Sequence, residues 1–378
     1  YMTAYVTLGE NAVADGCFPH RTEDYIVLKS LADDYYLDMV YYYLGCLLYD
    51  RRAYGEAIAD YEEAALRYPD FPTVHRNLAL AYYNVKKQPQ RAYEEMEKAF
   101  ALDETDARVY LELDQLKKRL NVPVKERWSD MEKHFDLVES RDDLYLEYVT
   151  LLNTLGESEK ALNLIKARKF HQWEGGEGKV AAQYLTALYQ LAKAAAAEGE
   201  YVEAKTILLQ AVDEYPQNLG EGKLESAQEN NLYYLLGLAQ EKLGETEEAF
   251  ASLTKACHGE SEPVGMMYYN DQPPEMIYYQ GLAYRKLGNE EQAVRRFRKL
   301  VEYGREHIEE NVKIDYFAVS LPDLLIFEEN LDERNRKHCL FMMSLGLKGL
   351  GRSDEAEKCA EELLAMDNAH QGIWVHDL

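Results

Sequence analysis

Residues 38–69, DMVYYYLGCLLYDRRAYGEAIADYEEAALRYP, decide the fold. Counted from Asp38, small residues stand at positions 8 and 20, which are Gly45 and Ala57. Small side chains there let two antiparallel helices approach closely, whereas large ones at positions 4, 7, 11 and 24 fill the space between neighbouring hairpins. Pro69, at position 32, ends the second helix because proline cannot continue the hydrogen-bonded backbone. The stretch therefore predicts a helical hairpin that packs against similar hairpins.

This pattern resembles the tetratricopeptide repeat of about 34 residues, and the same frame recurs along the chain. A repeat from Pro72 fits in its first helix and slips by one residue in its second, and residues 106–141 are helical without a readable frame. We therefore expect an all-α fold, a right-handed superhelix of about nine helical hairpins. The other clear frames start at Asp142, Leu185, Asn230, Pro274 and Lys337.

Extra residues separate the repeats at 176–184, 219–229, 264–273 and 308–336. Each insertion lies between the second helix of one repeat and the first helix of the next, which places all four loops along one edge of a solenoid. A solenoid does not need such loops for stability, so their shared placement indicates a built surface.

The repeats also suggest domain boundaries. The chain begins at Tyr1, within a helical pattern and without a methionine, so we expect that an upstream segment has been removed. The expected divisions are a degenerate capping hairpin at 1–37, repeats at 38–175, repeats with long inter-repeat loops at 176–370, and a tail at 371–378.

Composition narrows the function. The chain has 378 residues, with 42 Lys and Arg against 68 Asp and Glu, and a net charge of −26. This charge argues against nucleic acid or an anionic membrane as a partner and favours a basic or neutral ligand. No apolar run approaches the ~18 residues of a membrane-spanning helix. The five cysteines form no CxxC pair and are expected to be buried thiols, so we expect no metal, no cofactor and a cytoplasmic protein.

A short motif, Gly-Glu-Gly-Lys, occurs at 176–179 and again at 220–223. A Walker phosphate loop requires Ser or Thr after the lysine, but Val180 and Leu224 stand there. The motif either closes turns before helix N-termini, whose dipoles favour glutamate, or contributes to a ligand-binding edge.

Aromatic residues and carboxylates accumulate in and beside the inserted loops. Flat rings stack on sugar rings and carboxylates bind hydroxyl groups, so the combination is typical of sugar binding. The alternative is that the aromatic residues anchor the loops to the solenoid. These loop-edge candidates are His171, Trp173, Glu174, Glu177, Glu221, Tyr268, Asn270, Asp271, Glu275, Asp315, Tyr316 and Asp323.

Rings also recur on the first helices of the repeats, at frame position 5, which usually faces the concave groove of such an array. A ladder of rings could grip a peptide or a glycan, or the rings could pack between adjacent first helices. These groove candidates are Tyr42, Tyr189, Tyr234, Tyr278 and Phe341.

Three longer strings carry a second resemblance: EGGEGKV at 174–180, YYNDQPPE at 268–275 and DYFAVSLPD at 315–323. They resemble the C-terminal tetratricopeptide arm of a bacterial family of unknown function whose members carry an N-terminal galactose-mutarotase-like β-sandwich. The resemblance covers essentially the whole chain and implies a link to carbohydrate metabolism, with the sugar-active domain absent from this chain. It assigns no catalytic residue to the arm. His75 departs from the pattern, because an aromatic residue would suit its packing position.

These observations predict a binding or scaffold module and not an enzyme. Its partners would be a protein, the absent N-terminal domain, or a glycan. Two rivals remain open. Alternating helices could close into an (α/α) toroid that gathers carboxylates at one end, as in many glycosidases, or the array could be a dimerisation arm.

Overall fold

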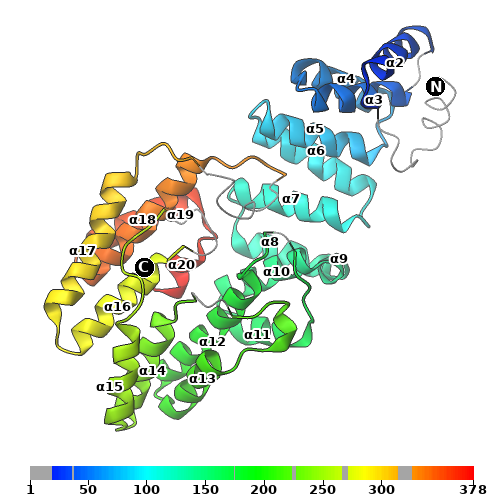
Figure 1. Ribbon diagram of the computed structural model, residues 1–378. Helices are drawn as coiled ribbons and strands as arrows, with labels where there is room; N and C mark the ends of the chain where they lie inside the picture. Colours follow the sequence, from blue (N-terminus) through cyan, green and yellow to red (C-terminus); the bar gives the residue numbers. More distant parts are fainter. Residues whose placement is uncertain (1–18, 36–37, 174, 224–226, 266–270, 314–325) are drawn as a thin grey trace. The chain divides into compact units, whose positions relative to one another are not determined.

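The structure is a computed structural model, and the part of the chain that it describes is almost entirely helical, without strands (Figure 1). The prediction of an all-α fold built from helical hairpins is confirmed. The described residues are 19–35, 38–173, 175–223, 227–265, 271–313 and 326–378.

The chain divides into two compact units. The first consists of Tyr1–Leu120 with Ile326–Glu328, and the second of Asn121–Leu325 with Glu329–Leu378. The boundary falls within 106–141, the region without a readable frame, because α7 packs on α6 of the first unit whereas α8 and α9 pack on α10 of the second. The helices of the first unit are α2 (Thr22–Tyr35), α3 (Asp38–Asp50), α4 (Tyr54–Arg67), α5 (Pro72–Asn84), α6 (Pro89–Leu102) and α7 (Ala107–Arg119).

In the first unit, α3 pairs with α4 and α5 with α6 as successive hairpins. A Cβ atom added to Gly45 would lie 2.5 Å from the Tyr61 ring, which is the close helix approach that the sequence pattern predicts. Residues 326–328, part of the fourth insertion, also belong to this unit. Phe327 is buried with its ring 5.1 Å from that of Tyr83, and the Asn84 side chain bonds to the main chain on either side of it.

The second unit contains five further hairpins, which are α10 with α11, α12 with α13, α14 with α15, α16 with α17, and α18 with α19. The turns within the hairpins of α12 and α14 are closed by Gly199 and Gly244, whose φ values are +87° and +81°. The helices are α8 (Val124–Lys133), α9 (Phe135–Ser140), α10 (Asp142–Thr154), α11 (Ser158–Ala167), α12 (Lys179–Glu198), α13 (Tyr201–Asp213), the 3₁₀ turn η1 (Gln217–Leu219), α14 (Asn230–Lys242), α15 (Thr246–Ala256), α16 (Pro274–Lys286), α17 (Glu290–His307), α18 (Leu331–Gly349), α19 (Ser353–Met366) and α20 (Gln371–Val375).

Two of the expected loops are partly helical, which corrects the sequence prediction. Residues 179–184 belong to α12, and residues 331–336 belong to α18. Each helix starts six residues before the expected first residue of its repeat, because the residue that begins the helix lies further upstream. Gly178 has a φ of +73°, and the Asn330 side chain accepts hydrogen bonds from the first-turn amides of α18.

The described cysteines, Cys46, Cys257, Cys339 and Cys359, are free thiols, and Cys257 and Cys339 are buried. Burial raises the pKa of both buried thiols to about 11, which makes them poor nucleophiles. Cys17 lies outside the described residues. Among the described helices, none has the length and apolarity that crossing a bilayer requires.

Candidate binding groove

The first helices of successive hairpins in the second unit, α10, α12, α14, α16 and α18, provide one continuous face, which we call the first-helix face. Neighbouring members contact one another along the series. The short helix α20 lies against this face, between α10 and α12 on one side and α16 and α18 on the other (Figure 1). A segment from the end of the sequence thus occupies the surface that tandem repeats usually present to partners.

Polar contacts hold both ends of α20. At its start, Gln371 and Gln183 of α12 exchange amide hydrogen bonds of 3.0 and 3.1 Å. After its end, Lys193 of α12 donates to the carbonyl oxygen of Val375 at 3.0 Å and forms an ion pair of 2.5 Å with the Asp377 carboxylate. The ammonium group of Lys193 therefore binds one main-chain carbonyl oxygen and one carboxylate.

A second lysine and a tyrosine complete these contacts. Lys348 of α18 donates to the main-chain carbonyl oxygens of His376, at 3.2 Å, and of Asp377. The imidazole Nδ1 of His376 is hydrogen-bonded to the Tyr279 hydroxyl at 2.9 Å, and that hydroxyl is bonded to the Tyr189 hydroxyl at 2.6 Å. Burial, with help from nearby Lys193, lowers the pKa of His376 to about 3, so its imidazole is neutral at physiological pH.

The apolar part of the interface is small and closely packed. Ile373 and Val375 are only 2% and 6% exposed. Gly372 lies directly on Phe341 of α18, because a Cβ atom added there would be 2.5 Å from the ring. The His370 ring lies 4.8 Å from the same phenylalanine. Only a residue without a side chain fits at Gly372.

The groove candidates divide into two groups. Phe341 lies against Gly372 of α20 and 4.8 Å from the ring of His370, which precedes α20. The ring of Tyr189 lies 6.1 Å from that of His376, which follows α20. Tyr234 lies 5.7 Å from Tyr279, the ring that receives His376.

Two groove candidates pack within the array. Tyr278 is buried against Phe297 of its own hairpin, with the ring centres 5.8 Å apart. Tyr42, in the first unit, is buried 5.0 Å from Phe71. Only part of the predicted ladder therefore lies near α20 and the residues that flank it.

Three residues at the centre of the interface escaped the sequence prediction: Tyr279, Lys193 and Lys348. A signal for two of them was present. Lys193 is position 9 and Lys348 position 12 of their frames, one and two helical turns beyond position 5 on the same side of the helix. Tyr279, at position 6, stands next to a candidate and carries no separate signal.

A cavity of about 290 Å³, the groove pocket, opens beside α20. Asp271 and Glu275 of the loop-edge candidates line it, together with Tyr189 and residues of α12, α14 and α20. Burial raises the pKa of Glu275 to about 7. The adjacent Lys223 is paired with Glu229 at 2.5 Å. The pocket is thus lined by polar and aromatic side chains, and residues of α20 form part of its wall.

Four other loop-edge candidates meet at a second cavity of about 330 Å³, the loop-edge pocket, which His171, Trp173, Glu177 and Glu221 line. Trp173 covers Gly176 so closely that a Cβ atom there would collide with the indole.

Two of these four candidates also anchor the loops. Glu221 accepts a hydrogen bond of 2.9 Å from the main-chain amide of Gly178, which joins the two Gly-Glu-Gly-Lys motifs at the start of α12. Burial raises the pKa of Glu221, and the negative charge of Glu177 adds to the effect. The main-chain amide and imidazole of His171 bond to the Asp142 carboxylate at 2.9 Å each. The remaining candidates, Glu174, Tyr268, Asn270, Asp315, Tyr316 and Asp323, lie outside the described residues.

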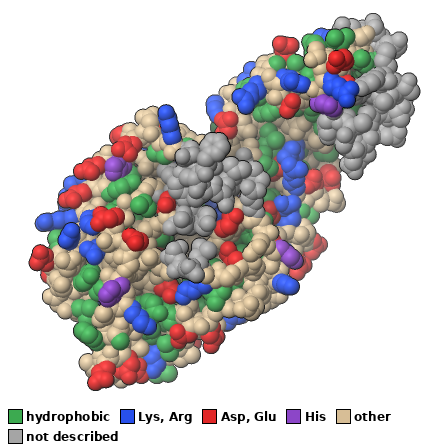
Figure 2. All heavy atoms as spheres, in the orientation of Figure 1, with side chains coloured by type: hydrophobic (Ala, Val, Ile, Leu, Met, Phe, Trp, Pro, Cys, Tyr) green, Lys and Arg blue, Asp and Glu red, His purple; other side chains and the backbone are tan. Residues whose placement is uncertain are grey.

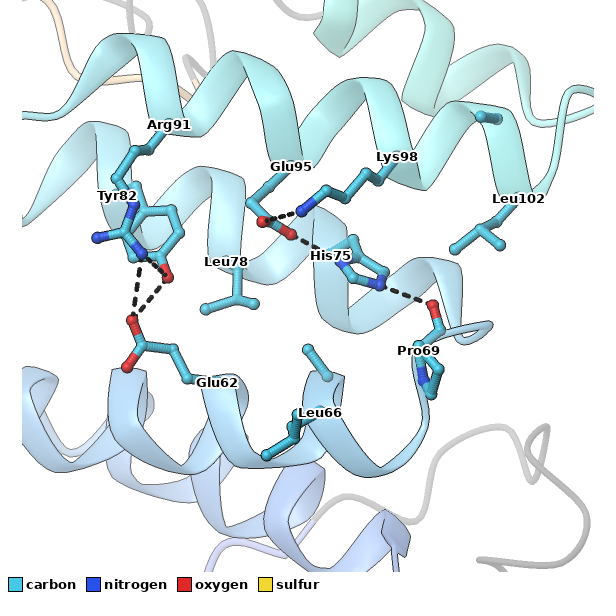
Figure 3. A pocket seen from close by; sticks show the side chains of 12 residues that line it. Glu62, Leu66, Pro69, His75, Leu78, Tyr82, Arg91, Glu95, Lys98 and Leu102 are labelled. Carbon is cyan, nitrogen blue, oxygen red and sulfur yellow. Dashed lines mark hydrogen bonds and ion pairs between the residues drawn. The ribbon is translucent and has the colours of Figure 1, made fainter.

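The first unit has its own pocket, of about 600 Å³, between α4, α5 and α6 (Figure 3). Its polar side chains satisfy one another. The His75 imidazole bonds to the Glu95 carboxylate at 2.6 Å and to the Pro69 carbonyl oxygen at 2.8 Å. At the other end, Arg91 lies over the Tyr82 ring, 4.0 Å from its centre. His75 of α5 therefore fills its packing position by hydrogen bonding to α6 and to the turn between α4 and α5.

Comparison with known families identifies tetratricopeptide repeats in both units. One tetratricopeptide repeat model matches residues 42–107, a second matches 186–218 and 275–303, and a third matches 231–257. These segments coincide with hairpins of the structure, so both units contain tetratricopeptide repeats.

Several solved structures are similar to this chain. PilW, a widely conserved type IV pilus biogenesis factor, is 13% identical, with a TM-score of 0.34 and coverage of 61% of this chain and 92% of that one. The Naa15/Naa10 complex bound to HypK-THB gives 11% identity and a TM-score of 0.43, over 100% of this chain and 61% of that one. YrrB, a tetratricopeptide protein with an unusual peptide-binding site, gives 15% identity and a TM-score of 0.24, over 65% and 97%.

Proposed function

We propose that the second unit is an interaction module that binds a short segment of a protein partner on its first-helix face. One observation supports this above the others: a segment of the chain itself, α20, is held there by residues of α10, α12, α16 and α18. Its contacts include main-chain carbonyl oxygens as well as side chains, so the face can hold a peptide by features that every peptide has.

Local charge refines the choice of partner. The chain carries −26 overall, and acidic and basic side chains are interspersed over the visible face of the second unit (Figure 2). At α20, however, two lysines, Lys193 and Lys348, point at the occupant. Because charges within a few ångströms outweigh a screened net charge, the face is suited to a segment with an acidic residue despite the acidic chain.

A photo-crosslinking residue placed at Thr186, in the wall of the groove pocket, tests the proposal in cells. We expect it to capture a protein partner through one short segment, which then binds the purified chain in calorimetry. The matched control is the same crosslinker at Val202, which is 64% exposed on α13. Equal capture from both positions, or a partner segment that binds equally well after Lys193→Glu, would contradict the proposal.

A second candidate function is glycan binding at the loop-edge pocket. It is supported by the meeting of Trp173, Glu177 and Glu221 at one cavity and by the resemblance to the arm of a mutarotase-like family. An indole beside carboxylates provides a stacking surface and hydroxyl acceptors. Under this proposal the arm would supply sugar recognition to a larger carbohydrate-related protein.

Titration of the chain with monosaccharides and glycans tests this candidate. We expect Trp173→Ala and Glu177→Gln to abolish binding while the melting temperature stays within a few degrees. Glu221→Gln serves as the structural comparison, because Glu221 caps α12. If Trp173→Ala instead lowers the melting temperature strongly, the indole anchors the loop, and the glycan proposal fails.

A further inference from the structure

Helix α20 has an unusual place for a helix of a repeat array. Each preceding helix of the five hairpins packs against its hairpin partner, whereas α20 has none. Its contacts go instead to residues far away in the sequence, from Thr150 and Gln183 to Tyr279 and Lys348. It is therefore bound as a ligand would be, across several repeats.

The docked segment has little structure of its own to preserve. Helix α20 has five residues, and a helix of that length does not persist in water without tertiary contacts. Trp374, in its middle, is 49% exposed, so only one side of the segment is buried. Short elements with few buried contacts open at lower free energy than the core of a domain. We therefore expect α20 to exchange between a docked and a released state.

The contacts fall into two classes. The lysine bonds to the carbonyl oxygens of Val375 and His376 can be made by any peptide. Three others depend on the side chain: the ion pair of Asp377 with Lys193, the bond of His376 to Tyr279, and the close approach of Gly372 to Phe341. The contacts of the second class determine which peptide sequences the first-helix face prefers.

We propose that α20 and the residues after it are an intramolecular stand-in for the partner segment, which must displace them to bind. This inference rests on the proposed function. The partner segment is then a short peptide in which buried aliphatic residues are followed by a neutral hydrogen-bonding ring and an acidic residue. The ring meets Tyr279, and the acidic residue meets Lys193.

The groove pocket gives a competitor a place to begin. Its walls include Gln371, Gly372, Val375 and His376 of the docked segment as well as residues of α12 and α16. A peptide can therefore contact the first-helix face beside α20 before α20 leaves. Displacement can proceed stepwise without prior exposure of the whole face.

The substitution Gly372→Val releases the segment without altering the face that receives it. The added side chain would collide with the Phe341 ring, because even a Cβ atom lies 2.5 Å from it. Gly55→Val is the matched control, since a Cβ atom at Gly55 meets nothing within 4 Å. In the full chain, hydrogen exchange over residues 371–377 should become at least tenfold faster with Gly372→Val and stay unchanged with Gly55→Val. If Gly372→Val alone leaves the segment docked, adding Asp377→Lys turns the ion pair into repulsion.

A labelled peptide of residues 369–378, AHQGIWVHDL, then measures binding in trans. We expect it to bind the released variant at least tenfold more tightly than the unaltered chain. Changing the peptide at His376→Ala and Asp377→Asn, or the released chain at Lys193→Glu, should each weaken binding at least tenfold. Equal binding to the released and unaltered chains, while residues 371–377 exchange freely in the variant, would overturn the proposal.

The same measurements separate the two proposals. If a partner captured at Thr186 binds the unaltered and released chains equally, the module binds partners but α20 is not their stand-in. If the peptide binds the released chain while no partner is captured at Thr186, the face accepts its own segment and the proposed function fails. If residues 371–377 of the unaltered chain exchange only with global unfolding, α20 belongs to the core and the displacement proposal is wrong.

Discussion

His75 shows what one polar residue does at a position that favours a large ring. Both of its ring nitrogens face acceptors, the Glu95 carboxylate and the Pro69 carbonyl oxygen. Both nitrogens must therefore donate, which requires the protonated imidazole. The bond to Glu95 raises the pKa of His75, and the contact with His75 helps lower the pKa of Glu95 against the effect of burial. The residue ties the turn between α4 and α5 to α6.

Replacing His75 with Leu should destabilise the chain by about 1–3 kcal/mol, because the Pro69 carbonyl oxygen loses its donor and Glu95 keeps only Lys98. Urea unfolding at pH 6, followed by probes in α5 and α6, measures the change. His258→Leu is the control, since the exposed side chain of this histidine bonds to the Thr254 carbonyl oxygen of its own turn, and it should change stability by no more than about 0.5 kcal/mol. A loss at His75 as small as the control would mean that the imidazole only fills space.

At the scale of the element, the hairpins could be predicted because their contacts are local and periodic. Frame position 8 lies against frame position 24 in three repeats: Gly45 against Tyr61, Gly237 against Leu253, and Gly281 against Phe297. In each pair a Cβ atom on the glycine would lie 2.7 Å or less from the larger side chain. A sequence pattern that encodes a steric requirement can be read without a structure.

The docking of α20 could not be predicted in this way. Gln371 meets Gln183 across 188 residues of sequence, and nothing in the local pattern of either helix encodes the partner. The loop-edge pocket was partly predictable, because Trp173 lies just before the first insertion and Glu221 lies in the second. Glu275 went elsewhere, since it stands in the first turn of α16 and lines the groove pocket. The position at which each helix starts therefore determined which of the loop-edge candidates lie at the same pocket.

At the scale of the whole molecule, the two units hold histidines that respond to pH in opposite ways. The pKa of His75 is raised above its usual 6.5, so its contribution to the first unit is complete below pH 6.5 and is lost as the pH rises through the raised value. The pKa values of His376 and His370 are lowered, because burial disfavours their charged forms. Their contribution to the docking of α20 is present above pH 6.5 and is lost as the pH falls.

Acidification from pH 7.5 to pH 5 should therefore release α20 while the first unit gains stability. Released His376 takes up a proton with a pKa near 6.5, whereas docked His376, beside Lys193 and Lys348, resists protonation until about pH 3. This difference alone shifts the docking equilibrium about thirtyfold by pH 5. The other groups around the segment are Asp377, the Tyr189 and Tyr279 hydroxyls, and Glu275 across the groove pocket.

Hydrogen exchange, corrected for the intrinsic effect of pH on amide exchange, measures both responses in one sample. Residues 371–377 should exchange at least tenfold faster at pH 5, whereas α5 and α6 should exchange more slowly. In the His376→Asn variant the segment keeps a neutral hydrogen-bonding group, so the part of the pH response that His376 carries should disappear, whereas the part carried by His370 should remain. Uniform acceleration in both units would instead indicate general acid destabilisation. An unchanged response in His376→Asn would show that another group, with His370 the first to test, controls the docking of α20.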